Sequence, residues 1–357
     1  EVGLELLNIK GSSVDLLVSR KWLDPGNRLP ENAPLRAINP VFFDQSDVVS
    51  ERLRKLFGWS QFDNIIAPDT DWLYCPHDTR LSSKRFRTAI TIHDPRMFEP
   101  SFSKLSIKQF LANQVMTQWL RRAALEATVV FTVSEFSRNR LSELQNLDRS
   151  KIFNIGNGVS KKFADNGSYS REFSESSSEK KTLVVVGGLR YLKGGDYIIQ
   201  LAKALLAIGS PMEIVAIGGP DDPKMSATAR TLPNIKQIGF VTDDELYRYL
   251  DNAFAMLNFS RYEGFGLPVI EAMSLGKPVI AHNATALPEV IGDAGFLVSD
   301  GNIEQVIELI EQLSSNSELY RSVQEKSRQH SKSYTWTNVA KRIFDVFNNY
   351  PQAEVRR

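Results

Sequence analysis

Residues 260–278 read SRYEGFGLPVIEAMSLGKP and place two glutamates around a glycine-bracketed turn that opens a predicted helix. The apolar run AMLNF at 255–259 fits a buried strand, and the residues from Pro268 onward have helical spacing. Gly264 and Gly266 permit the backbone conformations of a tight turn, and the proline suits a first helical turn because its missing N–H costs nothing there. Since the free N–H groups of such a helix start favour an anion, we expect a phosphate here.

The two glutamates flank this predicted anion site. Glu263 precedes it, and Glu271 lies about one turn into the helix. Carboxylates beside a phosphate make sense when they accept hydrogen bonds from hydroxyl groups, such as those of a sugar and a ribose on either side of a diphosphate. The alternative is an ordinary helix N-terminus, where acidic residues favour the helix dipole.

The stretch EGFGLPVIE, from Glu263 to Glu271, resembles the E-x7-E motif of the retaining glycosyltransferases of GT-B fold called glycosyltransferase family 4. The SLGKPVIA that follows at 274–281 extends the resemblance. It implies two Rossmann-like parallel-sheet domains that face each other across a cleft. It also implies that Glu263 contacts the donor sugar and Glu271 the ribose. The donor-binding residues of the turn itself would be Gly264, Phe265, Gly266 and Leu267.

Length and composition restrict the possible classes of protein. With 357 residues and 42% hydrophobic content, the chain is long enough for two cores. Its 43 basic and 42 acidic side chains give a net charge of +1, which argues against nucleic-acid binding. The single cysteine, Cys75, excludes an internal disulfide framework and fits a reducing compartment. No apolar run approaches the roughly 18 residues that span a bilayer, so we expect a cytoplasmic protein, peripheral to the inner membrane face at most.

The N-terminal half, residues 1–163, alternates predicted strands and helices, as in a parallel α/β sheet. Its first segment reads as a helix ending at Gly11. In the resembled family a strand and a glycine-rich turn come before that helix, so we expect the chain to begin inside a domain. Strands are predicted at 13–19, 64–68, 72–75, 88–92 and 129–133, and helices at 48–59, at 111–127 and after the cap Ser134.

Two His-Asp pairs lie in this half. His93-Asp94 directly follows the predicted strand 88–92, and ligands of open α/β sheets bind beyond the carboxyl ends of strands. The resemblance implies that His93 contacts the donor sugar near the reacting carbon. His77-Asp78 lies in a loop without such a strand, so we interpret His77 as an ordinary surface or core residue.

Basic residues gather near apolar ones between positions 80 and 110. They are Arg80, Lys84, Arg85, Arg87, Lys104 and Lys108. The simpler interpretation is an exposed helix face. The alternative is a peripheral membrane contact, because members of the resembled family with lipid-linked acceptors meet a membrane through such a surface.

A Ser-rich linker is predicted at 164–180 and a second domain at 181–333, which begins with the strand TLVVV and a glycine-rich turn. An ammonium on this turn, that of Lys193, can neutralise a leaving diphosphate, and the resembled family has a lysine with that role here. The family also has an arginine directly after the first glycine, where this chain has Gly188. Arg190 is the candidate substitute.

Further strands are predicted at 213–217, 235–240 and 278–281. The resemblance places the nucleobase near the second of these, so Phe240 and Val241 are candidate wall residues. The amphipathic segment 334–350 is predicted to be a helix that crosses back to the first domain. Residues 313–333 carry no motif that we can interpret.

The sequence therefore predicts a retaining glycosyltransferase that moves a sugar, with mannose as the first guess, from a nucleotide diphosphate such as GDP to a saccharide or lipid-linked acceptor. The candidate catalytic residues are His93, Lys193 and Glu263. No cofactor and no metal are expected, because the site has no DxD-type acidic pair and the four histidines are scattered. Two alternatives stay open. One is a non-catalytic nucleotide-sugar-binding subunit, favoured by Gly188 and the missing first strand, and the other is an epimerase or phosphorylase on the same fold.

Overall fold

The computed structural model describes residues 5–6, 8–10, 13–19, 39–43, 66–78, 83, 85–99, 107–166, 181–219 and 221–351. The chain divides into two compact units, one of residues 1–158 and 336–357 and one of residues 159–335. The sequence placed the boundary after residue 163. Residues 159–163 group with the second unit because the Val159 N–H donates to the Tyr334 carbonyl at 3.0 Å and α5 (Lys161–Asn166) packs against α9 (Leu267–Ser274). Of the predicted linker, residues 167–180 lie outside the described residues.

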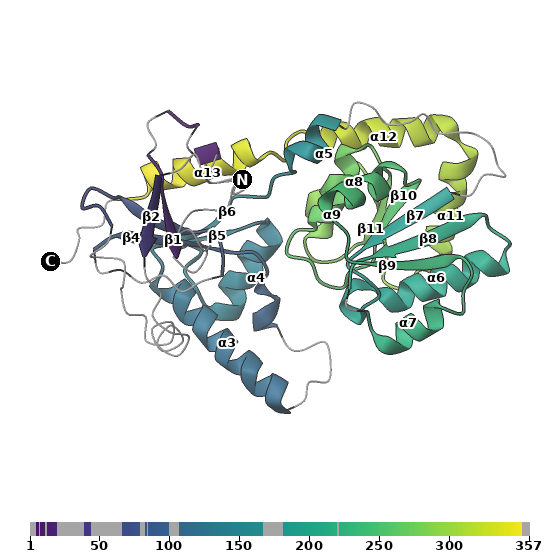
Figure 1. Ribbon diagram of the computed structural model, residues 1–357, viewed down its shortest axis with the longest axis horizontal. Coiled ribbons are helices and arrows are strands. Elements are labelled where there is room, and N and C mark those ends of the chain that lie inside the picture. The colour runs from purple at the N-terminus through teal and green to yellow at the C-terminus, as the bar shows by residue number, and fades with distance from the viewer. Residues whose placement is uncertain are drawn as a thin grey trace, which may run out of the picture. The chain divides into compact units, whose positions relative to one another are not determined.

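The first unit is built on a four-stranded parallel sheet. Its order is β3 (Trp72–Cys75), β4 (Arg87–Ile92), β5 (Val129–Thr132) and β6 (Ile152–Asn154). Successive side chains of a strand point to opposite faces. Ile90 and Ile92 join a core with α3 (Ile107–Glu126), whereas Ala89 joins a core with α13 (Trp336–Asn349). The C-terminal helix therefore packs on the sheet of the first unit, on the face opposite α3 (Figure 1).

Shorter elements complete this unit. A separate parallel pair is formed by β1 (Asp15–Ser19) and β2 (Asn39–Phe43). The helix α4 (Glu135–Gln145) begins at the predicted cap Ser134, whose Oγ accepts the Ser137 N–H at 3.0 Å. Two 3-10 turns are η2 (Pro95–Phe98) and η3 (Arg149–Lys151).

Four of the predicted strands of this half agree with β1, β3, β4 and β5 to within two residues. The strand predicted at 64–68 is wrong over its described residues 66–68, because the Thr70 N–H donates to the Ala67 carbonyl at 3.2 Å and closes a turn there. The strand β2 was not predicted, since Pro40 reads as a strand breaker that only an edge position tolerates. The predicted helix 48–59 lies outside the described residues.

The second unit contains a six-stranded parallel sheet of order β12-β11-β10-β7-β8-β9. The strands are β7 (Lys181–Val186), β8 (Met212–Ile217), β9 (Ile235–Gly239), β10 (Ala255–Asn258), β11 (Val279–His282) and β12 (Phe296–Val298). Counted from β7, this is the doubly wound Rossmann order, in which the direction of winding switches between the first and fourth strands. Those strands, β7 and β10, are neighbours. The turns after them therefore start side by side at the carboxyl edge of the sheet.

Helices cover both faces of this sheet (Figure 1). The helices α6 (Gly195–Ala207) and α7 (Pro223–Ala229) lie on one face, and α8 (Asp243–Asp251) and α9 lie on the other. The remaining helices are α10 (Leu287–Ile291), α11 (Ile303–Ser315) and α12 (Ser317–Ser331). The helix α12 lies in the stretch where the sequence showed no motif. Its apolar stripe, which includes Tyr320 and Val323 and packs into the core, is narrow.

Across the described part of the chain, no helix is both long and apolar enough to cross a membrane.

Candidate functional site

Two turns at the carboxyl edge of the second sheet carry the main candidate residues. One follows β7 and contains η5 (Tyr191–Lys193), and the other spans residues 259–266 between β10 and α9. The Nζ of Lys193 donates to Oε1 of Glu263 at 2.5 Å, although 70 positions separate the two residues. The Oγ of Ser260 donates to the same oxygen at 2.7 Å. The fold thus joins two of the predicted catalytic residues in one ion pair.

This ion pair is shielded from solvent on both sides. The side chain of Lys193 is 26% exposed and that of Glu263 is 14% exposed. The lysine stem crosses the turn backbone so closely that a Cβ added at Gly187 would lie 3.3 Å from it. Because partly buried charges are costly without a partner, each of these two groups requires either the other or a charged or polar ligand.

The helix α9 begins directly after this pair. Its N-cap, Gly266, has φ 104°, a left-handed conformation that favours glycine, and Pro268 lies in the first turn. No side chain caps this helix start, so no side-chain oxygen satisfies the free N–H groups at the positive end of the helix. Gly264 and Phe265 are buried, and Leu267 is 37% exposed.

The second predicted glutamate, Glu271, lies one turn into α9 and is partly buried. Its carbonyl accepts the Ser274 hydroxyl at 2.7 Å. The helix therefore carries Glu271 on the same element whose N-terminus lies beside Glu263, as the motif predicted.

The glycine turn after β7 explains why Gly188 stands where an arginine was expected. Gly188 has φ 72°, and a Cβ there would lie 2.5 Å from Oδ1 of Asp221 and 3.1 Å from the carbonyl of Gly218. A larger residue would strain this contact between neighbouring turns. The Nε of Arg190 donates to the Gly187 carbonyl at 3.1 Å, which ties that guanidinium to the same turn.

Phe240 and Val241 directly follow β9 at the same edge of the sheet. Phe240 is 81% exposed, and its ring lies over the turn after β8, 3.6 Å from a Cβ added at Gly219. Val241 is half-buried. An exposed aromatic ring at this position offers a planar face on which a base can stack.

The third predicted catalytic residue, His93, lies in the first unit at the end of β4. Its Nε2 lies 2.9 Å from the Pro76 carbonyl, which can only accept, so Nε2 carries the proton. Its backbone N–H donates to Oδ1 of Asp78 at 3.2 Å, and its ring lies 6.2 Å from that of His77. Burial raises the pKa of the Asp78 carboxyl. The two His-Asp pairs therefore meet, which the sequence did not indicate, because β3 and β4 are neighbours in the sheet.

Two residues near the Lys193–Glu263 pair were missed by the sequence reasoning. Arg261 and Asp196 form a two-pronged ion pair, with both oxygens of Asp196 accepting from the guanidinium at 2.7 Å. The sequence carries no local signal for this pair, since the partners are 65 positions apart.

His282 lies beside the turn after β10, in contact with two aromatic rings. It stacks on Phe259 with ring centroids 5.1 Å apart and meets Tyr197 edge-on at 4.9 Å. Burial lowers its pKa below the ordinary 6.5. Because the folded state then binds the proton less tightly than the unfolded state, the stabilising contribution is complete above pH 6.5 and declines as the pH falls toward the folded pKa.

We therefore expect the second unit to melt at a lower temperature as the pH drops from about 7.5 to about 5. In His282→Gln, whose side chain does not titrate, this decline should be shallower. Thermal unfolding followed by circular dichroism across that range measures both slopes. Equal slopes for the two proteins would contradict the assignment to His282.

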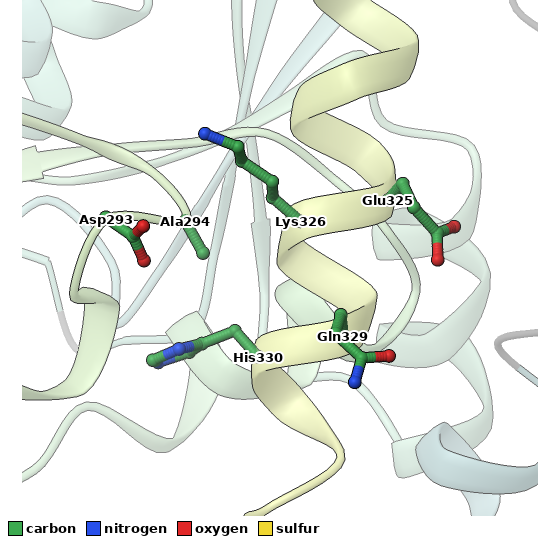
Figure 2. A pocket seen from close by; sticks show the side chains of 6 residues that line it. All are labelled: Asp293, Ala294, Glu325, Lys326, Gln329 and His330. Carbon is green, nitrogen blue, oxygen red and sulfur yellow. The ribbon is translucent and has the colours of Figure 1, made fainter.

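A pocket of about 540 Å³ lies elsewhere in the second unit, between α12 and the turn after α10. Figure 2 shows Lys326 and His330 extending toward Asp293, whereas Glu325 and Gln329 point away. The His330 Nε2 bonds to the Val290 carbonyl at 2.8 Å. No predicted site residue lines this pocket. Within the described ranges, no group of three or more His, Cys, Asp and Glu side chains is placed to hold a metal ion.

Residues 169–330 match the model of the family described as Glycosyl transferases group 1. O-antigen chain mannosyltransferase B of Escherichia coli is 26% identical over 294 residues, which cover 78% of this chain and 74% of that protein. Serotype-specific mannosyltransferase WbdA of Escherichia coli is 25% identical over 240 residues, which cover 64% of this chain. The chain spans only 29% of the length of WbdA.

Among solved structures, WaaG, a glycosyltransferase involved in lipopolysaccharide biosynthesis, has a TM-score of 0.66 at 14% identity, over 98% of this chain and 94% of that one. Two units with parallel sheets and this likeness show the GT-B fold, so the predicted fold class is confirmed.

Proposed function

We propose that this glycosyltransferase of GT-B fold moves a mannosyl group from a nucleotide diphosphate, with GDP as the first candidate, to a hydroxyl of a saccharide or lipid-linked acceptor, with retention of configuration. The observation that carries the proposal is the Lys193–Glu263 ion pair beside the uncapped start of α9, at the point where the winding of the sheet switches. The names of the two mannosyltransferase relatives support mannose, and the resemblance of EGFGLPVIE to family 4 supports retention.

In this proposal the donor lies along the carboxyl edge of the second sheet. Its diphosphate meets the start of α9 and the ammonium of Lys193, with Arg190 adding charge from the same turn. Glu263 accepts from hydroxyls of the sugar, and Glu271 accepts from the ribose. The base packs against Phe240 and Val241.

The reaction is a front-face substitution at the anomeric carbon, in which the acceptor attacks from the side on which the nucleotide diphosphate departs. The bond between this carbon and the β-phosphate oxygen breaks, and its electron pair leaves on the nucleotide diphosphate. The acceptor oxygen bonds to the same face of the carbon, and its proton passes to the departing phosphate oxygen. Lys193 stabilises the negative charge that develops on that oxygen. Because this charge is larger in the transition state than in the bound donor, its stabilisation accelerates the reaction.

The ion pair prepares both residues for this role. Without a donor, Glu263 satisfies the charge of Lys193 at 2.5 Å. A diphosphate offers the lysine a second anionic partner, and sugar hydroxyls offer the glutamate new donors. Lys193 thus gains an anionic partner and Glu263 gains hydroxyl donors, so that neither group is left buried without a partner.

The first unit supplies His93 and the acceptor side in this proposal. The hydrogen bond of Nε2–H to Pro76 fixes the ring orientation, and His93 contacts the sugar near the reacting carbon.

Peripheral membrane contact and cytoplasmic location stay predictions. Of the basic residues that suggested the contact, Arg87 stacks on Trp72 at 4.5 Å, while Arg80, Lys84 and Lys104 lie outside the described residues.

The test begins with thermal unfolding in the presence of GDP, UDP and ADP, in which we expect GDP to raise the melting temperature most. GDP-mannose and a mannose-containing oligosaccharide should then yield GDP and a lengthened product, whose new linkage has the anomeric configuration of the donor by NMR. Inversion would exclude retention. Sugar release that requires inorganic phosphate and frees no nucleotide would indicate a phosphorylase, and conversion of the donor to an isomer would indicate an epimerase. Binding without turnover of any donor would indicate a non-catalytic subunit.

A further inference from the structure

We propose that Arg261 is a positioning residue, which fastens the turn after β7 to the turn after β10 and so holds Lys193 where the leaving diphosphate forms. This inference rests on the role of Lys193 in the proposed function. Arg261 stands two positions before Glu263, and its contacts lie on both sides of Lys193 in the turn after β7 and the start of α6.

Arg261 binds two consecutive carbonyls of η5. Its backbone N–H donates to the Leu192 carbonyl at 2.9 Å, and its Nη1 donates to the Tyr191 carbonyl at 2.5 Å. The Tyr191 carbonyl also accepts the Gly194 N–H at 3.0 Å. Arg261 therefore fixes the backbone on the N-terminal side of Lys193 at two points. The position of the Lys193 side chain depends on that of this backbone.

The guanidinium is itself held on all sides. Nη1 and Nη2 donate to the two oxygens of Asp196 at 2.7 Å each, and Asp196 lies in the first turn of α6, directly after the Lys193 turn. The guanidinium carbon lies 3.9 Å from the centroid of the Tyr191 ring and 4.3 Å from that of Tyr197. Such a planar, forked arrangement is specific to arginine, because lysine has neither the fork nor the stacking face.

The charge of Arg261 is satisfied within this network. Its side chain is only 13% exposed. Burial alone would lower its pKa, but the hydrogen bonds and the charge of Asp196 raise the pKa above its ordinary value. This guanidinium binds a carboxylate, a carbonyl and two rings, so it is suited to hold the backbone in place. Lys193 has a carboxylate partner that a ligand can replace, so it is suited to bind the donor.

The first measurement needs no substrate. In Arg261→Ala, amide hydrogen exchange in the segment 190–195 should become at least about tenfold faster, because the bond of Nη1 to the Tyr191 carbonyl and the packing of the guanidinium on the Tyr191 ring are lost, while the backbone bond to the Leu192 carbonyl remains. Exchange in β8 should stay unchanged. Unchanged exchange in 190–195 would overturn the fastening, whatever the donor proves to be.

The second measurement is a double-mutant cycle with Lys193→Ala, using the donor that the transfer assay identifies. Arg261→Ala should lower kcat about 10- to 100-fold, since a displacement of about 1 Å can cost that much, with a change in donor KM of about threefold or less. In the Lys193→Ala background the same substitution should change kcat by about twofold or less. Equal losses in both backgrounds would overturn the proposal and leave Arg261 a purely structural residue.

Two further variants separate position from stability. Arg261→Lys keeps the charge but not the fork, and it should recover only part of the loss. Lys277→Met removes a buried lysine whose Nζ donates to the Asp251 carbonyl at 2.6 Å, at the amino edge of the same sheet. It should lower the melting temperature and leave kcat within about twofold. A failure of Lys193→Ala to change kcat would count against the proposed function, and the exchange result would still decide whether Arg261 fastens the turns.

Discussion

Lys193→Ala is expected to lower kcat for sugar transfer about 10²- to 10³-fold, with donor KM rising about tenfold or less. The ammonium faces the place where negative charge develops on the departing diphosphate, so its stabilising effect is larger in the transition state than in the bound donor. Steady-state kinetics with the identified donor and a saturating acceptor measure both parameters. The fold should persist, because the side chain is partly exposed and the Oγ of Ser260 still donates to Glu263.

The matched control for this variant is Lys203→Ala. Lys203 is an exposed lysine on α6 of the same unit, so its loss changes the net charge equally without touching the site. We expect its kcat to equal that of the unchanged protein within about twofold. If Lys193→Ala keeps more than about a third of the activity, or if Lys203→Ala loses as much, Lys193 is not the residue that stabilises the leaving group.

Gly194→Ala is expected to lower the free energy of unfolding of the second unit by about 3 kcal/mol or more. Gly194 has φ 72°, a conformation that costs an alanine about 1–2 kcal/mol. In addition, an added Cβ would collide with the backbone carbonyl of Phe259 in the turn after β10. Backbone cannot rotate away as a side chain can, so the two turns must separate. Urea unfolding followed by circular dichroism measures the loss.

Gly209→Ala isolates the conformational part of this effect. Gly209 has φ 66°, and an added Cβ there would meet nothing within 4 Å. This variant should lose only about 1 kcal/mol. Similar losses for the two variants would show that the close approach of Gly194 to Phe259 does not matter for stability. Because Gly194 also directly follows Lys193, its variant should lose activity even at temperatures where it is folded.

Sequence reasoning predicted the secondary structure around the candidate site residues best where the signal was local. The glycines, the proline and the spacing of Glu263 and Glu271 belong to one strand, turn and helix, and the structure has β10, Gly266 as N-cap and α9 at those positions. The alternation of strands and helices also indicated parallel sheets, and the strand pairing in both units confirms them.

Contacts between distant segments could not be predicted in this way. The meeting of His77 with His93 depends on β3 lying beside β4, and the partner of Arg261 depends on β7 lying beside β10. Hydrophobic periodicity reports which face of a strand is buried, and it does not report which strand is the neighbour. The strand β2 was missed for a related reason, because Pro40 obscures a short strand that is recognised only through its pairing with β1.

The sequence by itself determined that a glycine turn and a helix start follow a buried strand at Glu263, because φ, capping and periodicity are properties of a few adjacent residues. Only the tertiary structure decided that Lys193 and Glu263 form one ion pair and that Arg261 ties their turns together. The physical reason is the order of the strands: the winding switches between β7 and β10, which brings the two turns to the same edge although 70 positions separate the paired charges.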